Sequence, residues 1–514
     1  MFARLFKRSA ASNSRTATRR ALTPVVEGLE GRTMMSASAS GFVVTVNGDD
    51  NGVVRDDAIV LRRSSANLGN LEIVVNNQIQ LTRSLSDIST LNVNGRAGDD
   101  TLTLDDSRGA FSLSVTNTLN FDGGTGTNTL VIKGGSADTV YYGVGTTAGS
   151  GAISIPLSYP SVQSISFANV AKVKEQTSAA NFVYVGSSDA NEAISLDNGE
   201  VSNDGLLRIK DSTPAKTFAD VEFSNKTNLA IHSDYGTTFN PEAGQAYVSG
   251  DTDTVTLANT ESALGLTAIT VDTHQGADTV RIASSVVPIT VDTGSGNDSI
   301  ILGSATHHTV NGIGPRVTVR DTLDPFETLA NPAVSTGRDT LTFDDSGDTA
   351  ANSAEVSFSS VSGLGMVEGA TYSGMDKVVM NLGSGNDVVR VRSSARGVAY
   401  TVNAGLGDDT LRLGSQGSAT ERGRGTVNKL GGVFTFNGSR GTDSLIVDDS
   451  GDTADNSGNL TASQITGLGM GAVTFSDVEF IKVMCGSGND AFPELFFGSA
   501  GGVRILVDLG PGQL

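Results

Sequence analysis

The feature that most constrains this chain is a short Gly-x-Asp turn that recurs along the sequence and is followed by an alternating run. Eight copies end in an aspartate, and we call these residues the turn aspartates: Asp100, Asp278, Asp298, Asp339, Asp387, Asp409, Asp443 and Asp490. The runs after them, such as residues 279–282 and 410–413, alternate apolar and polar side chains. Alternation with a period of two is typical of a strand with one buried face. Each copy therefore predicts two short strands joined by a tight turn.

Repetition on two length scales indicates how these strands are arranged. Residues 339–353 return as residues 443–457, at an offset of 104 residues. Two pairs of turn aspartates are 20 and 22 residues apart, namely Asp278 with Asp298 and Asp387 with Asp409. About 20 residues is a plausible length for one coil of a solenoid. The sequence predicts an all-β protein, a parallel β-solenoid or β-helix of stacked short strands, with paired turns above one another at one corner.

Composition and charge divide the chain into three parts. Residues 1–40 carry seven Lys or Arg and two Glu, and the remainder has a formal charge of −26. We predict a basic targeting or disordered segment at 1–40, a degenerate β-repeat region at 41–250, and solenoid repeats with the duplicated unit at 251–514. Such an acidic body repels nucleic acid, and the sequence has no apolar run of 18 residues. Neither a nucleic-acid partner nor a transmembrane segment is expected.

The basic segment ends in a motif of its own. Residues 29–36 read Leu-Glu-Gly-Arg-Thr-Met-Met-Ser. They resemble the Leu-Glu-Pro-Arg-x-Leu-Leu motif near the start of many large exported bacterial proteins, with glycine in place of proline and two methionines in place of the leucines. The resemblance implies export to the cell surface or the medium. The alternative is a disordered basic tail.

The turns also resemble a known family of calcium-binding repeats. Residues 294–300, Gly-Ser-Gly-Asn-Asp-Ser-Ile, fit the Gly-Gly-x-Gly-x-Asp-x-apolar-x nonapeptide of the RTX repeats. Calcium prefers six to eight oxygen ligands, which glycine-rich turns supply through backbone carbonyls and aspartates through carboxylates. The resemblance implies that the eight turn aspartates are calcium ligands shared between neighbouring turns. This chain departs from the family because its turns are isolated or paired, whereas RTX nonapeptides run in uninterrupted tandem.

A metal-free interpretation of the same turns stays open. Gly, Asn and Asp tolerate left-handed backbone angles and form tight turns without any ion. Against it, aspartate ends eight of nine copies, the ninth being Asn128, and carboxylates stacked one coil apart would repel one another.

Catalytic motifs give little support to an enzyme. The chain lacks HExxH, GxSxG and GxxxxGK[ST] sequences, and it has one cysteine, Cys485, so a disulfide framework is excluded. The rival class is a β-helix enzyme that degrades acidic polysaccharides, a lyase or hydrolase. Its candidate acids, Asp344, Asp345 and Asp348, are duplicated near residue 448, which favours a structural role. The adjacent His307 and His308 are expected on a surface loop.

These observations predict a protein that is not an enzyme. We expect an exported structural or adhesive β-repeat protein, secreted or at the cell surface, that binds calcium ions. Its partners would be extracellular matrix, a polysaccharide or another cell-surface protein.

Overall fold

The structure is a computed structural model. It describes residues 36–48, 54–112, 118–157, 161–187, 191–213, 216–233, 251–322, 337–415, 425–495 and 502–511. Residues 1–35, which hold most of the predicted targeting segment and its motif, lie outside the described residues.

Strands account for nearly all regular structure in the described residues, together with two short 3-10 turns, η1 (Leu85–Asp87) and η2 (Asp106–Arg108). The first part of the chain forms β1 (Ser36–Ser40), β2 (Val43–Asn47), β3 (Ala58–Arg63), β4 (Asn70–Val75), β5 (Gln78–Ser84), β6 (Thr90–Asn94), β7 (Thr101–Asp105), β8 (Thr118–Asp122), β9 (Thr129–Val144), β10 (Gly151–Pro156), β11 (Val162–Ala168), β12 (Lys172–Val185), β13 (Ala193–Asn198), β14 (Leu207–Asp211), β15 (Asp220–Phe223) and β16 (Lys226–His232).

The second part forms shorter strands, mostly of four or five residues. They are β17 (Thr254–Ala258), β18 (Ala268–Asp272), β19 (Thr279–Ser284), β20 (Ile289–Asp292), β21 (Ser299–Leu302), β22 (Val317–Arg320), β23 (Thr340–Asp344), β24 (Ser353–Ser357), β25 (Ser360–Gly363), β26 (Ala370–Ser373), β27 (Lys377–Asn381), β28 (Val388–Val391), β29 (Ala399–Asn403), β30 (Thr410–Leu413), β31 (Val433–Asn437), β32 (Ser444–Asp448), β33 (Ser457–Leu460), β34 (Gln464–Gly467), β35 (Val473–Ser476), β36 (Phe480–Met484), β37 (Ala491–Leu495) and β38 (Arg504–Asp508).

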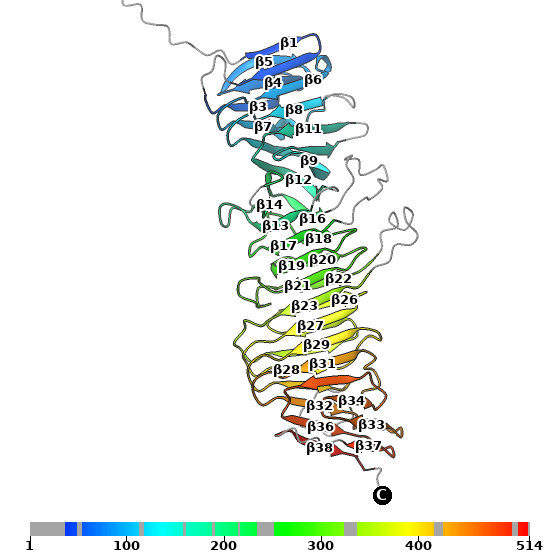
Figure 1. The fold of residues 1–514 in the computed structure, drawn as a ribbon. Helices are drawn as coiled ribbons and strands as arrows, with labels where there is room; N and C mark the ends of the chain where they lie inside the picture. The colour runs from blue at the N-terminus through cyan, green and yellow to red at the C-terminus, as the bar shows by residue number, and fades with distance from the viewer. Residues whose placement is uncertain are drawn as a thin grey trace, which may run out of the picture. The chain divides into compact units, whose positions relative to one another are not determined.

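Parallel pairing between successive coils organises these strands, and the predicted parallel β-solenoid is confirmed. The ladders run β2–β6–β8–β11, β3–β7–β9–β12, β16–β18–β20–β22–β26, β17–β19–β21–β23–β27–β29–β31–β35 and β24–β28–β30–β32–β36–β38. Figure 1 shows the coils following one another in chain order from β1 to β38. Because strands of one ladder are parallel and in register, equivalent residues of successive coils lie side by side.

The core is made of columns of aliphatic and aromatic side chains that face inward from these ladders. Val280, Ile300, Leu341 and Val378 are aligned on four successive strands, and each is at most 1% exposed. Burying a side chain of this size contributes about 1.5–3 kcal/mol relative to leaving it in water. The polar residues that alternate with them point outward, as the period-two pattern predicts.

Antiparallel hairpins interrupt the parallel ladders at particular coils. They pair β1 with β2, β3 with β4 and β4 with β5, β9 with β10 and β10 with β11, β13 with β14 and β14 with β15, β24 with β25, and β33 with β34. The last two hairpins occupy equivalent places in the 104-residue duplication. Between residues 130 and 233 the hairpins lengthen the coils, and the parallel pairing of β9 with β12 and of β12 with β16 continues through them.

Candidate metal site

The glycines of the Gly-x-Asp turns are required by the close spacing of the coils. Gly296 has a φ of 142°, and a Cβ placed on it would lie 1.4 Å from the carbonyl oxygen of Gly276 in the preceding coil. A Cβ on Gly337 would lie 1.5 Å from the carbonyl oxygen of Gly296. Any other residue would collide with the backbone of its neighbour, so glycine recurs at this place in each turn.

The turn aspartates form a hydrogen-bonded column that we call the aspartate ladder. The backbone N–H of one aspartate donates to Oδ1 of the aspartate in the next coil: Asp278 to Asp298 at 2.8 Å, Asp298 to Asp339 at 2.8 Å, Asp387 to Asp409 at 2.6 Å, and Asp409 to Asp443 at 2.9 Å. The predicted stacking of Asp278 on Asp298 and of Asp387 on Asp409 is thus confirmed. Each Oδ1 has a structural task, because it satisfies a buried backbone donor.

The remaining turn aspartates belong to shorter runs. Asp100 accepts the N–H of Asp57 and donates its own N–H to Oδ1 of Asn128, at 2.8 and 2.9 Å. Asp490 accepts the N–H of Asn456 at 2.8 Å. The structure therefore distributes the eight predicted residues over separate runs along the chain.

The second carboxylate oxygen of the ladder is buried without a donor. Oδ2 of Asp278, Asp298, Asp339, Asp409 and Asp443 accepts no hydrogen bond from the part of the chain that the structure describes, and each side chain is at most 3% exposed. Burial raises the pKa of Asp278 to about 8 and that of Asp409 to about 7, and neighbouring carboxylates in the ladder add to the effect. A buried anion of this kind is costly unless something neutralises it.

Asn128 takes the place of a turn aspartate, and its amide nitrogen shows which atoms surround the position of the second carboxylate oxygen. Its Oδ1 serves the ladder, and its Nδ2 donates to the carbonyl oxygen of Asn169 at 3.0 Å. A Cβ placed on Gly123 would lie 2.5 Å from both of those atoms, Asn128 Nδ2 and the Asn169 oxygen. Nδ2 thus occupies a pocket between a strand-end glycine and a backbone carbonyl of the next coil.

Aspartate places an acceptor in the same pocket. A Cβ on Gly438 would lie 2.6 Å from Oδ2 of Asp443 and 1.8 Å from the carbonyl oxygen of Asp477. Two oxygen acceptors therefore share the space where Asn128 has a donor and an acceptor. A proton on the carboxyl group or a cation between the oxygens would resolve the conflict.

The oxygen atoms available in these pockets are of the type that calcium binds. Within the described residues, no three ladder carboxylates each bring an oxygen to within 4.8 Å of the others. A calcium ion here would be held by one or two carboxylates together with backbone carbonyls, and not by a cage of carboxylates.

Two further acids lie against the ladder and were not predicted. The carboxylate of Asp321 adjoins Asp339, whose pKa is raised to about 8 mainly by burial and further by charged neighbours that include Asp321. Asp251 similarly contributes to the raised pKa of Asp278. Asp321 follows β22 directly, at the place that buried Thr293 takes after β20.

Of the duplicated acids that motivated the enzyme alternative, Asp348 and its copy Asp452 make the same hydrogen bonds. Oδ2 of Asp348 accepts from Nδ2 of Asn311 at 3.0 Å and from Nδ2 of Asn352 at 2.9 Å. Oδ2 of Asp452 accepts from the equivalent amides of Asn428 at 3.0 Å and Asn456 at 2.8 Å. These acids tie two turns of neighbouring coils together. Asp344 instead pairs with the exposed His308, at 2.9 Å between Oδ2 and Nδ1.

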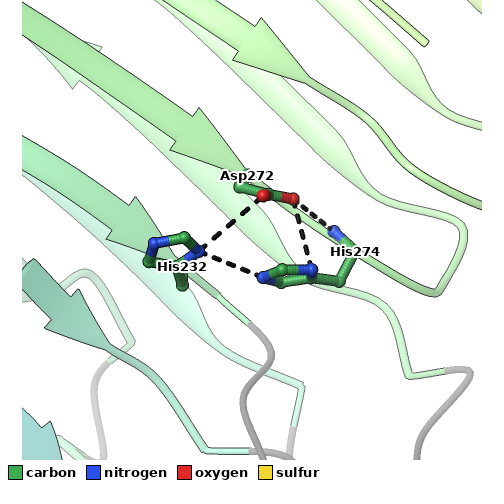
Figure 2. Close-up of side chains that lie close together, drawn as sticks. All are labelled: His232, Asp272 and His274. Carbon is green, nitrogen blue, oxygen red and sulfur yellow. Dashed lines mark hydrogen bonds and ion pairs between the residues drawn. The ribbon is translucent and has the colours of Figure 1, made fainter. Parts of the chain in front are cut away.

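A different group of side chains, which we call the His-Asp cluster, lies at the corner where β16 and β18 end. It consists of His232, Asp272 and His274 (Figure 2), and one ligand atom of each lies within 4.8 Å of the others. No motif in the sequence indicates this group. His232 and Asp272 are far apart in sequence and become neighbours because β16 and β18 pair in register.

Comparison with models of known families and with curated proteins finds no match to this sequence. Among the described residues, the structure has no helix with the length and apolarity needed to span a bilayer.

Proposed function

We propose that this chain is an exported structural or adhesive β-solenoid whose Gly-x-Asp turns bind calcium. The observation that carries the proposal is the buried second carboxylate oxygen of the ladder, which accepts no hydrogen bond from the described residues and at Asp443 lies near the backbone carbonyl of Asp477. Calcium would neutralise the carboxylates and use both kinds of oxygen as ligands. The acidic charge of the body, −26 outside residues 1–40, would concentrate cations around the turns.

The ladder also supports the metal-free alternative, in which the chain is a structural solenoid stabilised by its own hydrogen bonds. Each Oδ1 accepts a backbone N–H, and a protonated Oδ2 could donate to the facing carbonyl. The raised pKa of Asp278, about 8, is compatible with a proton at neutral pH. The two proposals differ in whether calcium or a proton occupies the pocket.

Export, adhesion and the choice of partner belong to the same proposal. The stacked coils present rows of identical turns, which suit repeated weak contacts with extracellular matrix, a polysaccharide or another cell-surface protein. The proposal assigns no catalytic role, since the duplicated acids Asp348 and Asp452 are engaged with asparagine amides in both copies.

Thermal unfolding of the chelated protein, followed with and without calcium, tests the calcium proposal. At pH 8 and millimolar calcium we expect the unfolding midpoint to rise by several degrees, because an ion that binds only the folded state stabilises it by about 2.7 kcal/mol at a concentration 100 times its Kd. Magnesium at equal concentration is the control and should shift the midpoint much less. An unchanged midpoint in calcium would favour the metal-free solenoid.

A further inference from the structure

The His-Asp cluster lies at a strand end whose counterparts in a later ladder form a different pairing. Strands β27, β29 and β31 each end in asparagine before a turn, and the amides stack: Nδ2 of Asn403 donates to Oδ1 of Asn381 at 2.7 Å, and Nδ2 of Asn437 donates to Oδ1 of Asn403 at 2.7 Å. His232 and Asp272 end β16 and β18, which belong to another ladder but also precede turns. The contacts between those three asparagines use amides alone.

The next coil shows how an acid in this column is normally satisfied. Oδ2 of Asp292 lies 2.8 Å from Nε of Arg320 and accepts the Thr322 hydroxyl at 2.6 Å. Asp272, one coil earlier, faces two histidines. Its Oδ2 is 3.8 Å from Nδ1 of His232, and its Oδ1 is 3.3 Å from Nδ1 of His274.

Ring nitrogens of the two histidines approach each other directly. Nδ1 of His232 and Nε2 of His274 are 3.1 Å apart, the ring planes are inclined by 20°, and Figure 2 shows Asp272 beside both rings. Two nitrogens bound to one tetrahedral zinc ion at about 2.0–2.1 Å are separated by about 3.3 Å. The nitrogens are thus nearly at ligand-to-ligand distance before any ion is present.

Backbone contacts hold His274 in position. Its side chain is 1% exposed and its φ is 58°, a turn conformation that the preceding and following coils fix. Its N–H donates to Oδ1 of Asp272 at 3.2 Å, and its carbonyl oxygen accepts the N–H of Ser295 at 2.6 Å. Gly294 lies against the His274 backbone, where a Cβ would be 2.1 Å from the carbonyl oxygen. Preorganisation of this kind lowers the cost of ordering a ligand.

We propose that His232, Asp272 and His274 form a three-ligand site for a divalent transition-metal ion, with zinc as the physiological class of ion. Two imidazole nitrogens and one carboxylate oxygen suit zinc, cobalt, nickel or copper, whereas calcium prefers oxygen ligands alone. His232 and Asp272 side chains are 24% and 25% exposed, so an ion can reach the site from solvent and keep water in the remaining position. The site is chemically distinct from the turn aspartates and independent of their calcium.

Metal analysis after equilibrium dialysis tests the site on the untagged full chain, in excess calcium so that oxygen sites are occupied. The wild type should retain one equivalent of zinc, and cobalt in its place should give the visible absorption of a nitrogen-coordinated ion. The variants His232→Asn and Asp272→Asn introduce the residue that ends the equivalent strands β27, β29 and β31, so they should fold. Each should bind zinc at least about 100-fold more weakly than the wild type.

His308→Ala is the matched control, because it removes a histidine paired with Asp344 outside the cluster. Its zinc affinity should equal that of the wild type. Failure of the wild type to retain zinc, or equal retention by His232→Asn, would overturn the proposal. Circular dichroism of each variant verifies the fold, and calcium-dependent stability of the same variants should be unchanged, which separates this site from the turns.

Discussion

The last position of the Gly-x-Asp turn holds aspartate in most copies and asparagine at Asn128. The two side chains differ in one atom, which is Oδ2 in aspartate and Nδ2 in asparagine. Asn128 presents an amide donor to the carbonyl of Asn169, whereas Asp443 presents a carboxylate oxygen near the carbonyl of Asp477. Both residues use Oδ1 to accept a backbone N–H of the preceding coil. Because both residues supply this Oδ1 acceptor, the hydrogen bond explains why the position is Asp or Asn. The preference for Asp must come from its second oxygen, Oδ2.

Replacement of Asp443 separates these two roles. In chelator at pH 8, Asp443→Asn should stabilise the protein by about 1 kcal/mol, because the new amide can donate to the Asp477 carbonyl and a buried charge is removed. Asp443→Ala should destabilise it by about 1–3 kcal/mol, since the N–H of Asp409 loses its acceptor. Urea unfolding measures both. Destabilisation by the asparagine variant without calcium would contradict the pocket described here.

Turns and strands depend on one another through the spacing of the coils. Gly296 and Gly337 have positive φ and lie against the backbone of a glycine in the preceding coil, and the strands on either side remain in register. The position of a strand and its turn consequently depends on the coil that packs against them. A strand keeps its register because the glycine in the adjacent turn has no side chain that would push the two coils apart.

Gly296→Ala tests this dependence on turn glycine. The added Cβ would collide with the Gly276 carbonyl oxygen at 1.4 Å, so we expect a loss of at least about 3 kcal/mol. Gly314→Ala is the control, because the nearest atom to its Cβ, the Ser285 carbonyl oxygen, is at an ordinary 3.6 Å. Its stability should change by less than about 1 kcal/mol. Similar midpoints for the two variants in chemical unfolding would show that the coils can separate at low cost.

The buried acids of the aspartate ladder together determine how the stability of the folded protein depends on pH. Burial raises the pKa of Asp278 to about 8, of Asp298 to about 7 and of Asp443 to about 6. These values exceed the ordinary value for aspartate, about 3.9. The folded state therefore binds protons more tightly than the unfolded state, and its stability declines as pH rises through this range.

In chelator, the unfolding free energy should fall by at least about 3 kcal/mol between pH 5 and pH 8. Calcium competes with protons for the same carboxylates, so saturating calcium should abolish most of this fall. Calorimetry across the pH range, with and without calcium, gives the comparison. Stability that rises with pH in chelator would mean that the ladder carboxylates are ionised and satisfied without metal.

Much of this architecture could be predicted because strand and turn are local properties. Alternation after Gly-x-Asp located strands such as β19 and β30, and the spacing of Asp278 and Asp298 gave the coil length where no loop intervenes. Residues brought together across longer coils could not be predicted, because the length of a coil varies. The His-Asp cluster is of this kind, and so is the contact of Asp321 with Asp339.

Each run of the aspartate ladder has a direction and an end. Donors point toward later coils, and the last N–H of a run is accepted by an acid outside any Gly-x-Asp turn, Asp376 for Asp339 and Glu479 for Asp443. A new run starts at once, with Asn352 on Asp387 in one copy and Asn456 on Asp490 in the other. Each copy of the duplicated segment thus contains both the acid that ends one run and the asparagine that begins the next. The 104-residue unit therefore already joins its copy in this chain with every run ended by an acid and the next run begun by an asparagine.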